Sequence, residues 1–281
     1  MKRSAINLVL VGLVASLAVA VWLTPTDDHS GAPASLTPLA PGKITAIQRL
    51  SRHGPALRML RLNESWHMTE PYALAANAER VKRLLNVAAA PTIEQFPMPE
   101  NRLQEFGLDA PLARLELNGL ALDFGNTDPI NHHRYVRFEG KLHLIKDIYA
   151  HHLTAPAEAF VSPRLVAEQA KILAVRTPGW QLFRQADGNW RMTPSVPGLP
   201  QDQLSSKIRA WQQSEALKVE AVQTEESAQR VEILLESAQD PLRFAILSRP
   251  DGTLLVRQEL GLGYRLPADS ELLIFPGGEK P

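Results

Sequence analysis

The sequence contains no cysteine, and this absence excludes several kinds of chemistry at once. Disulfide bonds, thiolate catalysis, cysteine-ligated zinc or iron–sulfur centres, and a lipidated cysteine all require a side chain that this chain lacks. Net charge is absent as well, because 30 Lys and Arg balance 30 Asp and Glu, and no long basic run occurs. Nucleic-acid binding rests on many phosphate contacts from clustered Lys and Arg, so we expect no nucleic-acid partner.

Common enzyme and cofactor motifs are also missing. The chain has no phosphate-binding P-loop and no Gly-x-Ser-x-Gly nucleophile elbow. Gly261-Leu262-Gly263 resembles part of a dinucleotide-binding loop, but it lacks the third glycine, so we expect a bend within a strand. Asp109 is an acid or base candidate, although its neighbours Gly107 and Pro111 favour a turn-capping role. We therefore assign no catalytic residue and no cofactor, and the sequence favours a non-enzymatic role.

Five histidines gather in one region and raise the question of a metal site. Imidazole is a common zinc and copper ligand. Adjacent histidines on a strand point to opposite faces, however, and no His-Glu-x-x-His helix accompanies them. His133 and His143 lie on neighbouring expected strands and could approach each other across a hairpin. The sequence favours solvated loop and strand histidines over a metal site for the set His132, His133, His143, His151 and His152.

The amino terminus carries an apolar run from Ala5 to Leu23, preceded by Lys2 and Arg3. Nineteen helical residues span roughly 28 Å, which is close to the hydrocarbon thickness of a bilayer. The basic residues before the run predict a cytoplasmic amino terminus and an extracytoplasmic remainder. A cleaved signal peptide is the alternative, since Ala18–Ala20 has the small-x-small form of a cleavage site. Because the apolar run continues to Leu23, we favour a retained anchor.

Residues 24–42 are rich in Pro, Ser, Thr, Ala and Gly and show no apolar periodicity. This composition predicts a flexible linker between the anchor and the globular part of the chain.

A tetrapeptide pattern occurs twice, as Trp66-His67-Met68-Thr69 and as Trp190-Arg191-Met192-Thr193. Trp and Met lie two residues apart and therefore face one side of a strand, which we expect to be the core side. A pair of ligand-stacking tryptophans is the less favoured interpretation. Two strand patterns precede each tetrapeptide, and turn residues stand directly before it: Lys43–Ile47, Leu57–Leu62 and Asn63–Ser65 in the first half, and Lys171–Val175, Gln181–Ala186 and Asp187–Asn189 in the second.

An amphipathic helix and further strands follow in both halves. The first helix shows Val81, Leu84, Leu85 and Ala88 at helical spacing, with Asn77 as a cap and Pro91 as its end. The second shows Leu204, Ile208 and Trp211 after Asp202. The later strands are expected in these ranges: Leu112–Gly125 and His133–Ile145, then Arg230–Ile246 and Thr253–Leu266. The order of elements predicts an α+β fold with two tandem related units of antiparallel strands, at 43–160 and 171–276, after one transmembrane helix.

These motifs resemble a bacterial envelope domain family of unknown function. The resemblance rests on the Trp-bearing hairpin, the helix, the turn Phe-Gly-Leu-Asp-Ala-Pro at Phe106–Pro111, and the Tyr-Val strand at His133–Ile145. It covers most of residues 43–165 and, more weakly, 171–275, where the Phe106–Pro111 turn has no counterpart. Members of the family often occur beside, or within, auxiliary components of gliding-motility-type ABC transporters, and they supply no catalytic residues to carry over.

Two functional hypotheses follow. The favoured one is an accessory or scaffolding protein, anchored in the inner membrane through residues 5–23, with the bulk of the chain in the periplasm. It would bind a protein partner in an envelope or ABC-transporter complex. The alternative is a periplasmic ligand-binding protein or hydrolase with its site between the two units, because clefts between domains commonly hold ligands.

Overall fold

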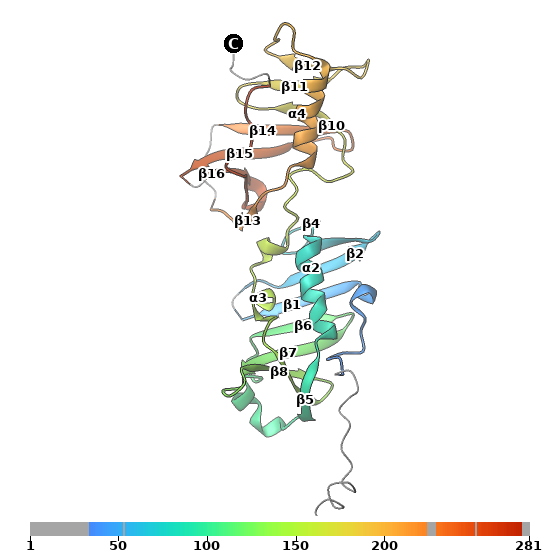
Figure 1. Cartoon of the computed structure of the whole chain (residues 1–281), viewed down its shortest axis with the longest axis vertical. Coiled ribbons are helices and arrows are strands. Elements are labelled where there is room, and N and C mark those ends of the chain that lie inside the picture. The colour runs from blue at the N-terminus through green and yellow to red at the C-terminus, as the bar shows by residue number, and fades with distance from the viewer. Residues whose placement is uncertain (1–33, 53, 224–228, 251, 277–281) are drawn as a thin grey trace, which may run out of the picture.

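The computed structural model describes residues 34–52, 54–223, 229–250 and 252–276 (Figure 1). The predicted membrane-spanning segment 5–23 and the first part of the predicted linker lie outside these residues. Across the described ranges, no helix is both long enough and apolar enough to cross a membrane.

The described chain is mostly β, with two antiparallel sheets and few helices, which agrees with the coarser part of the α+β prediction. Its first sheet runs in the spatial order β4 (Leu74–Ala75), β3 (Ser65–Glu70), β2 (Leu57–Leu62), β1 (Ala46–Ser51), β6 (Ala113–Leu117), β7 (Leu120–Thr127), β8 (His133–Phe138), β9 (Lys141–Lys146), β5 (Thr92–Pro97). The second runs in the order β12 (Trp190–Thr193), β11 (Gln181–Arg184), β10 (Ile172–Arg176), β14 (Arg230–Leu235), β15 (Leu242–Arg249), β16 (Gly252–Arg257), β17 (Leu262–Arg265), β13 (Lys218–Ala221).

The two sheets have the same connectivity once the short strand β4 is set aside. In each sheet, the third strand of the unit, β3 or β12, lies at one end. The strand that follows the longer helix, β5 or β13, lies at the opposite end. This crossing places β5 beside β9 in the first sheet and β13 beside β17 in the second. Figure 1 shows the two units end to end, each with one longer helix over a face of its sheet. A shared connectivity of this kind is what an internal duplication predicts.

The two longer helices begin and end for different local reasons. Helix α2 (Ala78–Leu85) starts at Asn77, whose side-chain oxygen accepts a hydrogen bond from the Arg80 amide at 3.2 Å, as the sequence predicted. It buries Val81, Leu84 and Leu85 of the predicted stripe, but it ends at Leu85, earlier than predicted, and Ala88 is buried in the following turn η2 (Asn86–Ala89). Helix α4 (Gln201–Gln213) starts after Pro200, which supplies no side-chain cap. Asp202 therefore lies in its first turn and not before it. The remaining helical turns are η1 (Pro41–Lys43), η2 (Asn86–Ala89), η3 (Glu100–Phe106), α3 (Ala150–Leu153), η4 (Ala157–Phe160) and η5 (Gln258–Leu260).

The repeated tetrapeptide lies on β3 and β12, the strands that precede the two longer helices. Met68 and Met192 are buried, as expected for core positions. Trp66 and Trp190 are only partly buried, although both pack against the core. The tetrapeptide is therefore a structural element whose methionine lies deeper than its tryptophan.

Residues 34–42 correct the linker prediction, because they pack against the first unit. Leu36 is 2% exposed, and its amide donates to the Ala90 carbonyl oxygen at 2.8 Å. The Thr37 amide donates to the Ala88 carbonyl oxygen at 3.0 Å. The composition of this segment is that of a linker, yet its backbone finds partners at the end of η2 and its leucine fills a core position. Only residues 24–33 of the predicted linker are left outside the described chain.

A short connecting segment, residues 160–166, is bonded to both units. On the first unit, the Ser162 amide donates to the Ala75 carbonyl oxygen at 2.9 Å. On the second, the Ala216 amide donates to the Pro163 carbonyl oxygen at 2.9 Å. The segment thus lies between the β4 edge of the first sheet and the start of β13 in the second (Figure 1).

Candidate functional site

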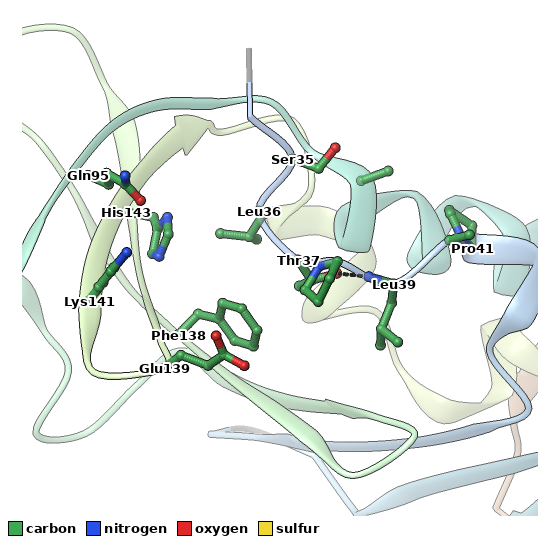
Figure 2. A pocket seen from close by; sticks show the side chains of 13 residues that line it. Ser35, Leu36, Thr37, Leu39, Pro41, Gln95, Phe138, Glu139, Lys141 and His143 are labelled. Carbon is green, nitrogen blue, oxygen red and sulfur yellow. Dashed lines mark hydrogen bonds between the residues drawn. The ribbon is translucent and has the colours of Figure 1, made fainter. Parts of the chain in front are cut away.

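A cavity of about 630 Å³ opens at the end of the first sheet that is farthest from the connecting segment. One wall is the segment Ser35–Pro41, and the opposite wall carries Phe138, Lys141 and His143 (Figure 2). Gln95 of β5 stands at the rim. The mixed apolar and polar lining is typical of sites that bind a ligand or a partner side chain.

Local geometry explains why these side chains meet. Glu139 and Gly140 both have positive φ, 47° and 71°, which gives the tight turn that joins β8 to β9. In the paired strands His143 lies opposite Val136 on one side and opposite Gln95 on the other. All three therefore belong to the face that helix α2 covers elsewhere. Helix α2 and η2 end at Ala89, so this end of the sheet face is left to the segment Ser35–Pro41.

His143 is the most constrained polar group beside the cavity. Its side chain is almost fully buried, with the residue 6% exposed, and its Nδ1 lies 3.5 Å from the Thr92 hydroxyl oxygen. Its Nε2 has no hydrogen-bond partner among the described residues. Burial, and next the positive charge of Lys141, hold the pKa of His143 below its ordinary value. The imidazole is therefore neutral at pH 7, and Lys141 carries the positive charge at this site.

The described residues beside the cavity form no close catalytic arrangement. Across the described ranges, no three His, Asp or Glu side chains gather closely enough to hold a metal ion. The Thr92 hydroxyl lies 3.5 Å from His143 Nδ1, which is longer than the roughly 2.6–3.2 Å typical of a nucleophile–base pair. What the site offers is an apolar pocket between Leu36 and Phe138 with a polar rim.

The structure separates the histidines that the sequence grouped. His133 pairs with Lys146 across β8 and β9 and not with His143, so the two do not approach across the hairpin. His151 and His152 stack on α3 with ring centroids 3.8 Å apart. Burial, and then the neighbouring charges of His151, Arg80 and Arg83, lower the pKa of His152. His133, His151 and His152 do not line the cavity, whereas His143 does.

The Phe106–Pro111 turn has a packing role. Gly107 ends η3 with a φ of 66°, and the Phe106 ring contacts the Tyr135 ring edge-on at 4.9 Å. A Cβ atom at Gly125 would collide with the Phe106 carbonyl oxygen, so the turn docks tightly over β7. No hydrogen bond from Asp109 is among those of the described chain, which leaves its predicted capping role unsupported. Gly261 has a φ of 64° and ends η5, and Leu262 and Gly263 begin β17, so the predicted bend lies at the start of a strand.

Arg49 is a feature that the sequence analysis did not identify. It is fully buried on β1, and its Nη1 donates to the Ala155 carbonyl oxygen at 2.6 Å. The guanidinium lies 5.3 Å from the centre of the Phe160 ring, and its Nε and Nη2 have no partner in the described chain. Burial lowers the pKa of Arg49 to about 10, although the charge of Glu158 acts in the opposite direction. The sequence does contain a sign of this buried cation: Arg49 stands two residues after Ile47, at a position that strand alternation assigns to the core.

Glu158 is engaged elsewhere and does not neutralise Arg49 by direct contact. Its carboxylate accepts a hydrogen bond from the Tyr72 hydroxyl at 2.5 Å. Burial, and then this carboxylate, raise the pKa of Tyr72. The buried Arg49 and the partly buried Tyr72 and Glu158 therefore lie directly before the connecting segment, where their hydrogen bonds help to hold residues 155–160 against the first sheet.

A second cavity, of about 570 Å³, lies at the carboxyl-terminal end of the second unit. It is lined by residues of Ser248–Thr253 and Leu266–Ile274. Each of the two cavities is lined by residues of a single unit.

Comparison with known proteins gives a family match and no closer relative. A family model described as a domain of unknown function (DUF4340) matches residues 66–236. The match runs from β3 of the first sheet to the end of β14 in the second, so it includes parts of both units and the connecting segment. No curated protein and no solved structure matches the chain.

Proposed function

The chain belongs to the DUF4340 family, and from this premise we propose that it is a non-enzymatic accessory or scaffolding protein of the bacterial cell envelope. In this proposal residues 5–23 anchor the chain in the inner membrane, and both units stand in the periplasm. The partner is a protein of an envelope complex, and an ABC transporter is the complex that the family resemblance favours.

The observation that carries the proposal is the connecting segment. Residues 160–166 are bonded to both sheets, and Ala76 and Val161 form one bridge while Arg164 and Glu215 form another. These bonds favour one elongated body in which the connecting segment holds the two units end to end. An extended body with surfaces at both ends suits a protein that connects or positions others.

The same observation weighs against a site between the two units. A ligand-binding protein or hydrolase of that kind needs an open cleft between its domains. Here the space between β4 and β13 is occupied by the connecting segment and η4. The alternative function therefore has less support than scaffolding.

Purification of the full chain from native membranes after cross-linking tests the proposal. Stoichiometric recovery of a membrane permease and its ATPase is the expected result. A monomer that recovers no membrane protein, yet shows a thermal shift with one specific small molecule, would contradict it.

Membrane attachment has its own test. An alkaline phosphatase fusion after residue 42 should be active, and the mature protein should retain the mass of residues 1–23. A soluble product that begins near Val21 would instead identify a cleaved signal peptide.

A further inference from the structure

Three of the four ends of the two sheets are covered by other parts of the chain. The β4 edge is paired with the connecting segment through Ala76 and Val161, and η4 lies against β13. The β12 edge is closed by one side chain: the Trp190 amide donates to the Gln201 Oε1 at 2.9 Å, and the Gln201 Nε2 donates to the Trp190 carbonyl oxygen at 2.8 Å. Covering an edge in such ways prevents other strands from pairing with it.

The fourth edge, β5, has no covering segment along Ile93–Pro97 among the described residues. In the part of the chain that the structure describes, β9 is the only strand beside it. Residues 93–97 are all exposed, including the large apolar side chains of Ile93, at 40%, and Phe96, at 44%. An edge strand presents alternate amide and carbonyl groups outward. A register shift between Thr92 and Glu94 interrupts this alternation, and Pro97 has no amide hydrogen, so the backbone groups available to a partner lie within Ile93–Phe96.

The beginning of the same edge already binds an extended segment. The Thr92 amide donates to the Ala34 carbonyl oxygen at 2.9 Å, and the pairing continues through Ser35 and Pro91. Strand-like addition is therefore compatible with this edge. The cavity lies directly beside it, with Ser35 and Gln95 at the rim (Figure 2). Gln95 shares the face of His143, so a strand added beside β5 would direct alternate side chains over the cavity.

The number of residues before Ala34 limits the distance between the β5 edge and the membrane. Ten residues, 24–33, separate the end of the apolar run from Ala34. Ten fully extended residues reach at most about 33–36 Å. Because Ala34 is bonded to Thr92, the β5 edge is held within that distance of the membrane if residues 5–23 span it. The second unit is joined at the opposite end of the first sheet.

We propose that the open edge of β5 and the cavity beside it are the docking site for an extended segment of a membrane-embedded partner protein. The segment adds a strand beside Ile93–Phe96 and inserts an apolar side chain between Leu36 and Phe138. This inference rests on the anchored orientation in the proposed function. A lipid surface is disfavoured, since acyl chains cannot form hydrogen bonds with the outward backbone groups of the edge.

The absence of cysteine allows a clean test in the full chain. Glu94→Cys places a single thiol on the β5 edge, on the face away from the cavity. Arg191→Cys places the matched control on the β12 edge, which Gln201 closes. Each variant is labelled with a thiol-reactive benzophenone in native membranes and irradiated, and the adducts are mapped by mass spectrometry.

The expected result is an adduct from position 94 to one short stretch of an integral membrane protein, absent from position 191. The adduct should be lost when Ile93→Lys and Phe96→Lys are added, because charged edge residues oppose strand pairing. Both side chains are exposed, so an unchanged melting temperature should accompany the loss.

Other outcomes would overturn the inference. Adducts to lipid alone would make the edge a membrane-contact surface, and adducts to a second copy of the chain would make it a dimer interface. Equal adducts from positions 94 and 191, or adducts that survive the double Lys change, would show that the edge is not specific. If a membrane partner copurifies but its adducts map elsewhere, the docking site is wrong while the proposed function stands. If no membrane partner copurifies, both fail.

Discussion

The two units close their cores differently although their strands follow the same order. In the first unit, Met68 of β3 lies opposite Met59 of β2, which in turn lies opposite Ile47 of β1. In the second unit, Met192 of β12 lies opposite Leu182 of β11, which in turn lies opposite Val175 of β10. Two residues further on, Arg49 and Thr177 therefore occupy equivalent places.

What surrounds these two equivalent residues differs in polarity. Arg49 is buried with two nitrogens that lack partners in the described chain. The Thr177 hydroxyl accepts a hydrogen bond from the Trp180 amide at 3.1 Å, and the Trp180 ring is buried with its Nε1 donating to the Leu273 carbonyl oxygen at 3.2 Å. At this place the second unit has uncharged side chains, Thr177 and Trp180, whose polar atoms are hydrogen-bonded, whereas the first unit has a buried cation, which is costly.

The exposed β5 edge also belongs to the first unit, and so do seven of the eight histidines, since His29 precedes residue 43. All eight histidines of the chain precede residue 153, and three of its five tryptophans follow residue 171. The two units therefore differ in core polarity and in edge exposure: the buried cation, the buried histidines and the exposed β5 edge all lie in the first.

The largest expected effect is on the second core. Trp211 is fully buried on the inner face of α4, so Trp211→Ala should lower the free energy of unfolding by about 3–5 kcal/mol. Trp66→Ala should cost clearly less, because Trp66 is only partly buried. Chemical denaturation of both variants gives the two values. Equal losses would contradict the different burial of the two tryptophans.

The next effect concerns Arg49. Arg49→Ala removes the hydrogen bond to Ala155 and leaves a cavity, and we expect a loss of about 2–5 kcal/mol. Arg49→Met fills similar space without a charge, so its cost should be below about 1.5 kcal/mol or reversed in sign. Thermal unfolding separates the two. A Met variant as unstable as the Ala variant would mean that the guanidinium itself stabilises the first core.

A smaller effect is expected at the start of α2. Asn77→Ala removes the only side-chain cap on the two longer helices of the described chain and should cost about 1 kcal/mol. Asn77→Asp keeps an acceptor oxygen and should stay near the original stability. Loss of helix stability in the Asp variant as well would show that another property of Asn77 matters.

The smallest expected effect is a pH dependence confined to the first unit. Burial lowers the pKa values of His143 and His152 below the ordinary 6.5. In the unfolded chain these groups take up protons as the pH falls below 6.5, before the folded chain does, so stability present above pH 6.5 is lost as the pH falls through the folded-state values.

Hydrogen exchange at pH 7 and pH 5 measures this effect separately in each unit. Amides of α2 and β9 should lose protection at pH 5, while those of β10 and β14 change less. His152→Gln should reduce the difference. Equal loss of protection in both units would assign the pH dependence to other groups.

Local patterns predicted most of the elements but few of their partners. Alternation and turn residues placed β2 at Leu57–Leu62, and the spacing of Leu204, Ile208 and Trp211 predicted α4. The pairing of β5 with β9, which builds the cavity wall, joins residues about fifty positions apart and has no local signal. The segment Ser35–Pro41 looked like a linker because its composition lacks periodicity, and only tertiary contacts order it.

Hydrogen exchange of the β5 edge, compared between the purified chain and its native membrane complex, tests the central claim most directly. We expect the outward-facing amides among residues 93–96 to exchange rapidly in the purified chain and to be strongly protected in the complex, with no change at residues 190–193. Unchanged exchange at 93–96, or new protection at 190–193 alone, would contradict it.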